Sequence, residues 1–243
     1  MLGAASAALS ISVLITSAPR FKLVQKRRSM MPIWLPRPDS WSPYKLSAQV
    51  NEEFLTQRAS ELNQGISCKI DPTYPMGRRR VGGRHAHLGL VFPASEVYLA
   101  RLPRVNYTSF DDKLSNDILL NECATLEWPE RIEFPAPRPY DYGLRHDPRK
   151  GVGVAFMLIS EAHGRPLNQL TATREQLEKV YAQLADLYTK LSQHPFHQIG
   201  SLTIGEDDNV NIGPFTGNRT GTLSYLGPFN NANDYYFAWA KEY

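Results

Sequence analysis

Two glycines, two arginines and a glutamate are the residues of this chain best suited to bind a phosphate group. Gly82 and Gly83 lack a Cβ atom, so backbone N–H groups there can approach phosphate oxygens closely. Arg84 adds positive charge beside this turn, while Arg101 can neutralise phosphate oxygens and Glu122 can fix the Arg101 side chain. Arginine stands where such sites commonly carry lysine, and its planar fork differs from the point charge of an ammonium group.

Each of these signals also has a simpler interpretation. A glycine pair before a strand commonly marks only a tight turn, and an arginine–glutamate pair is commonly a surface ion pair worth less than about 1 kcal/mol. Their order along the chain favours a shared site. A turn, a cation on a later strand and a carboxylate on the next helix together form a phosphate-binding arrangement.

Period-two patterns predict the strands that position these residues. Residues 84–92 and 96–102 read as two strands joined by a turn that contains Pro93. In the second strand Leu99 and Arg101 fall on the same face, because successive side chains of a strand alternate between its two sides. The sequence therefore predicts that Arg101 projects from the middle of a small sheet.

Helical periodicity predicts three helices, over residues 47–62, 112–127 and 173–193. Ser47 is placed to cap the first helix and Gly65 to end it, and Pro129 is expected to stop the second. Thr173 and Gln176 form a capping-box pattern at the start of the third. The apolar face of this third helix is predicted to lie in the core. A short hairpin is expected over 204–212.

Several separate stretches give the chain a specific family resemblance. They are ARLP at 100–103, NECATL at 121–126, PAPRPYDYG at 135–143, the apolar run and its break at 152–167, and the segments 194–202 and 226–229. In these stretches the chain resembles the fungal branch of the aminoglycoside phosphotransferase-like family. The resemblance covers residues 80–243, which is most of the chain.

This resemblance implies an α+β, protein kinase-like two-lobed fold with a small antiparallel-sheet lobe and an incomplete helical large lobe. It also implies an ancestral ATP-dependent phosphoryl transfer to a hydroxyl group of a small molecule. The turn at 82–84 would cover the ATP phosphates, Arg101 would lie against them, and Glu122 would pair with Arg101. The residues implied to border the adenine, with backbone hydrogen bonds from the last two, are Met157, Ser160 and Glu161.

The family's catalytic and metal-binding loops have no counterpart in this sequence. None of the six histidines begins an H-x-D run with an asparagine five residues beyond the aspartate, and such a loop would be expected after Tyr243. The chain would thus be truncated before its catalytic loop. No catalytic residue is predicted, Mg²⁺ is not expected to be held, and ATP binding is expected to be weak or lost. The acceptor substrate is not identified. The alternative is a non-catalytic, pseudokinase-type binding or scaffold protein.

Charge and composition divide the chain into four predicted parts. Residues 1–38 carry six of the 27 Lys and Arg residues and no acidic residue, which leaves 21 basic and 24 acidic residues and a net charge of −3 elsewhere. The body is therefore not expected to bind nucleic acid. The predicted parts are a basic leader at 1–38, an N-terminal extension with one helix at 39–80, a kinase-like small lobe at 81–160 and a partial large lobe at 161–243.

The leader leaves three alternatives for the location of the protein. Its serine-rich, arginine-bearing and acid-free composition fits a mitochondrial transit peptide. A signal-anchor remains an alternative, because the apolar run at 2–18 is at the short limit for a membrane span. A disordered extension without an address would leave the protein in the cytoplasm. Membrane contact is expected only through this leader.

The histidines and cysteines are predicted to have no metal-binding role. His85 and His87 fall on the same side of a predicted strand, where exposure to solvent is expected. His194 and His197 fall in a turn, and a metal site needs three or four ligands. Neither of the two cysteines belongs to a C-x-x-C pair, so both are predicted to be small buried side chains.

Overall fold

The computed structural model describes most of the chain after the leader. The described residues are 49–71, 85–93, 96–103, 112–145, 147, 151–162, 164, 167–168, 170–205, 209–216 and 225–241. The leader at 1–38 and three of the predicted phosphate-site residues, Gly82, Gly83 and Arg84, lie outside them. In the described residues the fold is mixed α+β, with antiparallel sheets, as predicted.

A five-stranded antiparallel sheet forms the centre of the molecule, with the strand order β1-β2-β3-β5-β4. Its strands are β1 (Lys69–Ile70), β2 (His85–Val91), β3 (Val97–Pro103), β4 (Pro139–Gly143) and β5 (Phe156–Ser160). The predicted hairpin of β2 and β3 is confirmed, and Phe92 N–H donates to the Glu96 carbonyl at 2.9 Å to close its turn. Because β1 belongs to this sheet, the segment predicted as an extension contributes a strand to the central sheet.

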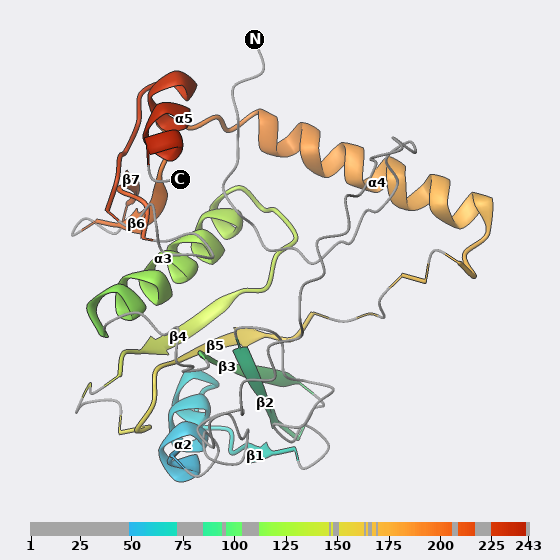
Figure 1. Ribbon diagram of the computed structural model, residues 1–243. Helices are drawn as coiled ribbons and strands as arrows, with labels where there is room; N and C mark the ends of the chain where they lie inside the picture. The colour runs from blue at the N-terminus through green and yellow to red at the C-terminus, as the bar shows by residue number, and fades with distance from the viewer. Residues whose placement is uncertain are drawn as a thin grey trace, which may run out of the picture.

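One helix covers each face of this sheet (Figure 1). On one face, α2 (Glu52–Leu62) inserts Leu55 and Ala59 into a core formed with the inward residues of β2, β3 and β5. On the other face, α3 (Asp112–Arg131) packs Leu119 and Cys123 against Met157 of β5. The alternation of β3 thus directs Arg101 toward α3, since Ala100 and Leu102 fill the α2 side.

The first helix begins later than the sequence suggested. Asn51 has an extended backbone, with φ of −78° and ψ of 96°, and its Oδ1 accepts the Phe54 N–H at 3.3 Å. This carboxamide satisfies an N–H group that has no partner within the helix. The predicted cap at Ser47 is therefore wrong, because Asn51 holds that position.

Helix α3 continues past the proline that was predicted to stop it. Pro129 lies in the last turn, where its fully buried ring packs in the interior, and the helix ends at Arg131. A proline in a helix removes one N–H donor, and here the cost falls near the end of the helix. The Pro129 carbonyl then accepts the Phe134 N–H at 2.8 Å, which turns the chain toward β4.

The near-continuous apolar run at 151–159 is the pattern expected of one buried strand, but it becomes a strand only at Phe156. Gly153 has a φ of +84°, which favours glycine, and a Cβ atom there would lie 2.6 Å from the Gln49 carbonyl oxygen. The preceding bends still place Val152 and Val154 in the core beneath α2. The run is therefore buried as predicted, although only its second half pairs with β3 and β4.

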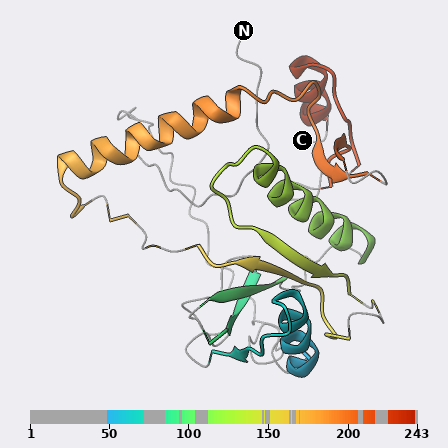
Figure 2. The same ribbon diagram turned by 180° about the vertical axis from the view of Figure 1, so that it is seen from behind.

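Helix α4 (Arg174–Ser192) has the predicted capping box, since Thr173 and Gln176 exchange side-chain and backbone hydrogen bonds. However, none of its residues is buried, and Tyr188 is 65% exposed. The prediction that its apolar face lies in the core is wrong for the described residues. Figures 1 and 2 show that α4 extends away from the layered body, so its apolar face has no layer to pack against there.

The last part of the chain forms a small unit that packs on α3. It consists of the antiparallel hairpin of β6 (Ser201–Ile204) and β7 (Val210–Gly213), followed by α5 (Ala232–Lys241). Ile199 and Phe229 pair by two backbone hydrogen bonds of 2.8 and 2.9 Å, which join the start of the hairpin to the segment before α5. Over the described ranges, no helix combines the length and apolar character needed to span a membrane.

Candidate functional site

The structure brings Arg101 and Glu122 together, as the sequence predicted. The Nη2 atom of Arg101 lies 3.5 Å from Oε1 of Glu122. The two side chains are 23% and 28% exposed, so the pair lies at a partly open edge between β3 and α3. An ion pair in this position is less screened by water than one on the open surface.

Packing of α3 on the sheet explains why this pair forms. Arg101 is the register partner of Met157 in the β3–β5 ladder, and Met157 is fully buried against Leu119 and Cys123 of α3. Glu122 lies one turn beyond Leu119, and residues three apart lie on the same side of a helix. The contact of Leu119 with Met157 therefore places the Glu122 carboxylate over Arg101.

The C-terminal unit holds α3 from its other side. Asn121, which is buried, donates from Nδ2 to the Thr216 hydroxyl at 2.6 Å. Nearer the start of the helix, the Tyr225 hydroxyl donates to Oδ2 of Asp117 at 2.7 Å and accepts from Nζ of Lys113 at 2.9 Å. These contacts limit movement of α3 away from the sheet, and hence movement of Glu122 away from Arg101.

A third residue, His85, completes the cluster and was not predicted to belong to it. Its Nε2 atom lies 3.4 Å from Oε2 of Glu122, and its Nδ1 atom lies 3.1 Å from Nη2 of Arg101. The side chain is only 13% exposed, so the prediction of a solvent-exposed histidine is wrong. The turn between β2 and β3 could have revealed it: once Phe92 faces Glu96, His87 must face Arg101, and His85 follows on the same side of the strand.

The guanidinium of Arg101 retains capacity for an anionic ligand. Within the described residues, both of its contacts use Nη2, whereas a guanidinium carries five N–H donors. Arginine can present two parallel donors to a phosphate group, which makes it a strong phosphate ligand. The residues present therefore fit a phosphate group at Arg101.

Cys123, next to Glu122 on α3, does not offer a nucleophile. Burial raises the pKa of its thiol to about 12, and the negative charges of Glu127 and Glu122 act in the same direction. A thiol with so high a pKa stays protonated near neutral pH, and only the thiolate attacks or binds metal. Cys123 therefore adds no reactive thiolate to the cluster, whose charged side chains are suited to binding an ion.

The residues predicted to border the adenine are less accessible than expected. Met157 is fully buried in the core, because α3 covers it, so it does not form an exposed wall. The Ser160 N–H donates to the Arg138 carbonyl at 2.8 Å, and the Glu161 N–H donates to the Val97 carbonyl at 3.2 Å. Recognition of a base here would have to use groups other than these two N–H donors.

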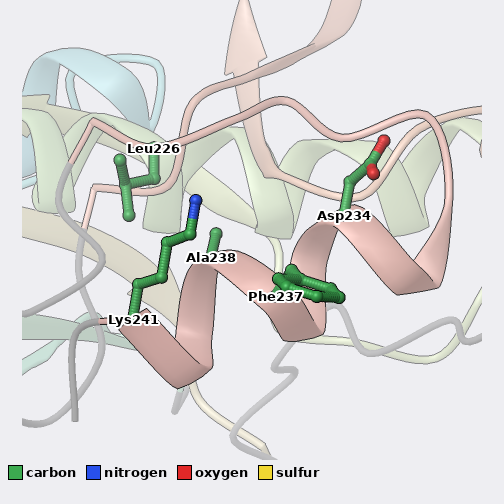
Figure 3. A pocket seen from close by; sticks show the side chains of 5 residues that line it. All are labelled: Leu226, Asp234, Phe237, Ala238 and Lys241. Carbon is green, nitrogen blue, oxygen red and sulfur yellow. The ribbon is translucent and has the colours of Figure 1, made fainter.

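A hollow of about 470 Å³ lies elsewhere, on the C-terminal unit. Figure 3 shows that Asp234, Phe237, Ala238 and Lys241 of α5 line it together with Leu226. None of its lining residues belongs to the Arg101 cluster. Because it mixes one carboxylate, one ammonium group and apolar atoms without a convergent set of donors, we do not assign the site to it.

Metal-ligand chemistry and sequence comparison give no further assignment. Among the residues that the structure describes, no three His, Cys, Asp or Glu side chains are grouped so that they could hold a metal ion. The chain matches no protein-family model, and a search of curated proteins finds no match.

Proposed function

We propose that this chain is an aminoglycoside phosphotransferase-like protein whose sheet-containing lobe binds the phosphate groups of ATP. The observation that carries this proposal is the contact between Arg101 of β3 and Glu122 of α3. In kinase-type phosphoryl transfer, a cation on the third strand binds the phosphates and a carboxylate on the following helix holds that cation. The proposal includes the overall fold: the chain would adopt a kinase-like fold with two lobes.

The order of elements supports the proposal independently of the pair itself. Strands β1, β2 and β3 follow one another in the sheet, and α3 follows β3 in the chain. Strand β5 then pairs with β3, and β4 lies at the edge of the sheet beside β5. In the sequence, residues 82–84, which are predicted to form a glycine turn, immediately precede β2, and β2 begins at His85 and pairs with the strand that carries Arg101. A phosphate bound at Arg101 would therefore be within reach of backbone N–H groups at the start of β2.

In this proposal each residue has a distinct task. Arg101 binds phosphate oxygens through its fork, Glu122 orients the guanidinium, and the 82–84 turn supplies backbone donors. ATP, when bound, supplies the phosphoryl group. The residues of this chain account for nucleotide binding, and the small-molecule acceptor of the family is not assigned to any of them.

A non-catalytic binding or scaffold function is the second candidate, and particular observations favour it. Two N–H donors near the expected base site, those of Ser160 and Glu161, are already paired within the protein, and Met157 is buried. In a scaffold, Arg101 and Glu122 would only stabilise the contact between β3 and α3. Exposed aromatic side chains on α4 and α5 would then offer surface for other proteins.

Nucleotide-induced thermal stabilisation distinguishes the two functions. A ligand that binds only the native state raises the free energy of unfolding, by about 2.7 kcal/mol at a hundredfold excess over its Kd. We expect millimolar ATP to raise the melting temperature of the native chain, and Arg101→Ala to abolish that rise. Arg174→Ala is the matched control, because Arg174 pairs with Glu178 on α4 and is not part of the cluster. No rise with ATP, with or without Mg²⁺, would favour the scaffold.

A further inference from the structure

Helix α4 carries an apolar stripe, although none of its residues is buried in the described part of the chain. The stripe residues recur at alternating steps of three and four along the chain, and they are Leu177, Val180, Leu184, Leu187 and Leu191. This is the heptad spacing, in which positions a and d form the seam between two helices of a coiled coil. The spacing therefore fits a second helix as the surface that covers this face.

The two flanks of this seam differ in chemistry. The heptad e positions on one side are Arg174, Tyr181 and Tyr188, and the g positions on the other side are Gln176, Gln183 and Lys190. Tyr181 is 46% exposed and Tyr188 is 65% exposed, so both rings have apolar surface open to water. In a parallel pair of helices each e position faces a g position, whereas in an antiparallel pair e faces e and g faces g. Only the antiparallel orientation brings the two aromatic flanks together.

The seam is self-complementary when two copies of α4 run in opposite directions. Position a of one helix then packs against position d of the other, so that Leu177 meets Leu187 of the second copy and Val180 meets Leu184. The same contacts recur in reverse, as an interface with two-fold symmetry requires. The two-fold axis passes near Ala182, at the middle of the helix.

The flanking residues are compatible with the same orientation. The Tyr181 rings of the two copies lie next to each other near the two-fold axis, where aromatic side chains can stack. Toward the ends of the pair, Arg174 faces Tyr188 of the second copy, and Lys190 faces Gln176 of the second copy. No like charges oppose each other at these flanking positions, so electrostatic repulsion does not oppose the pairing.

The position of α4 in the fold suits this orientation. Figures 1 and 2 show the helix projecting from the layered body, and Lys190 contacts that body near the C-terminal end of α4. Antiparallel pairing places the second body toward the opposite end of a helix that is about 28 Å long. It also sets the two helix dipoles in opposite directions, which is the more favourable arrangement.

We propose that α4 forms an antiparallel two-helix coiled coil with α4 of a second copy of this chain, so that the protein is a weak dimer. This surface does not include Arg101 or Glu122, and the dimer therefore does not depend on the proposed nucleotide site. A single pair of 19-residue helices buries less than the about 1,600 Å² of a standard protein interface, so we expect a Kd on the order of 50 μM. At the low micromolar concentrations of an unfolding experiment, the chain is then mainly monomeric.

Analytical ultracentrifugation of the full chain tests the dimer. Between about 5 and about 500 μM, the average mass is expected to rise from near that of the 27.5 kDa chain toward twice that mass. Leu184→Glu places a carboxylate in the middle of the seam and is expected to raise the Kd at least about thirtyfold. Ala182→Glu is the matched control, because it introduces the same carboxylate on the outward face of α4 and should keep the native Kd.

A charge exchange at Tyr181 tests the orientation. If the two copies of Tyr181 meet, Tyr181→Lys and Tyr181→Glu each bring like charges together. Each is expected to weaken the dimer about fivefold relative to Tyr181→Gln at low ionic strength. An equimolar mixture of Tyr181→Lys and Tyr181→Glu chains is expected to recover the affinity of Tyr181→Gln. In a parallel pair, position 181 would face Gln176, and mixing would recover nothing.

A monomer at every concentration would overturn the proposal and assign the apolar face of α4 to another occupant, either residues of this chain outside the described ranges or a different protein. A native Kd in Leu184→Glu, or loss of the dimer in Ala182→Glu, would overturn it as well. A mixture that recovers no affinity would overturn the antiparallel orientation. Circular dichroism checks that each variant is folded. Should Leu184→Glu not fold, the exchange at the exposed Tyr181 still decides whether the α4 helices pair.

Discussion

Helices α3 and α4 are nearly equal in length and both are amphipathic, yet one is buried and the other is not. Helix α3 has 20 residues and packs on the sheet on one side and on the C-terminal unit on the other. Helix α4 has 19 residues and a capping box at its N-terminus, and none of its residues is buried in the described part of the chain. Figure 1 shows the contrast directly: α3 lies within the layers and α4 projects from them.

The difference shows what an apolar stripe does and does not determine. Periodicity identifies which face of a helix avoids water, but the stabilisation comes from the surface that covers that face. In α3, that surface comes from Met157 and Ile159 of a distant strand. For α4, one contact with the body lies near its C-terminal end, where Nζ of Lys190 donates to the Glu133 carbonyl at 2.7 Å.

The largest expected effect tests this contrast with one substitution in two places. Leu158→Ala removes a fully buried side chain of β5 and should lower the free energy of unfolding by about 3 kcal/mol, since the lost transfer energy and the cavity both count. Leu184→Ala deletes the same atoms from the half-exposed face of α4 and should cost less than about 1 kcal/mol. Urea denaturation measures both.

Equal losses in these two variants would contradict the contrast. Such a result would mean that the apolar face of α4 is covered in solution. The surface that covers this face would then come from outside the described residues. Circular dichroism at low urea would confirm that each variant begins folded, so that the two free energies refer to the same native state.

A smaller effect is expected where α3 meets the C-terminal unit. Asn121→Ala removes the 2.6 Å hydrogen bond to Thr216 and should cost about 1 to 2 kcal/mol, because a buried polar partner is left without its bond. Thr216→Val removes the other partner, and the double variant should cost less than the two single losses combined. Thr203→Val is the control, since the Thr203 hydroxyl makes only a long, exposed contact at 3.5 Å. Strictly additive losses would show that this bond does not hold α3.

Much of the central layer could be predicted from the sequence, because its signals are local. The alternation in β3 placed Arg101 on the face opposite Ala100, and helical spacing placed Glu122 on the side of α3 that meets it. These patterns placed the two side chains on facing elements, and the kinase-type arrangement that the family resemblance implies predicted that they pair. The role of that contact in binding a nucleotide stays a prediction.

The remaining features depend on tertiary contacts that local patterns do not contain. The turn between β2 and β3 fixes the register that places His85 on the side of Arg101, but its burial also depends on the closeness of α3, which no local pattern shows. Pro129 is tolerated in α3 because its ring is buried in the last turn. Likewise, α2 packs on the central sheet because Leu55 lies in its core, and the composition of the segment does not reveal that contact.

The smallest expected effect comes from the N-terminal caps of two helices, α2 in the layered body and α4 outside it. Asn51 caps α2 and Thr173 caps α4, each by a side-chain oxygen that accepts a backbone N–H at 3.3 Å. Alanine at an N-cap typically costs about 1 kcal/mol. For Asn51→Ala this loss should appear in global unfolding, because α2 is part of the core. For Thr173→Ala it should appear only as local fraying.

Hydrogen exchange separates the two cases. Thr173→Ala is expected to speed exchange of the first amides of α4 severalfold and to leave the urea midpoint unchanged, since an unburied helix can open without disturbing the layers. Asn51→Ala is expected to lower the midpoint itself. If instead Thr173→Ala lowers the urea midpoint as far as Asn51→Ala does, α4 unfolds together with the layered body. The two would then form one cooperative unit, although α4 projects from that body in Figure 2.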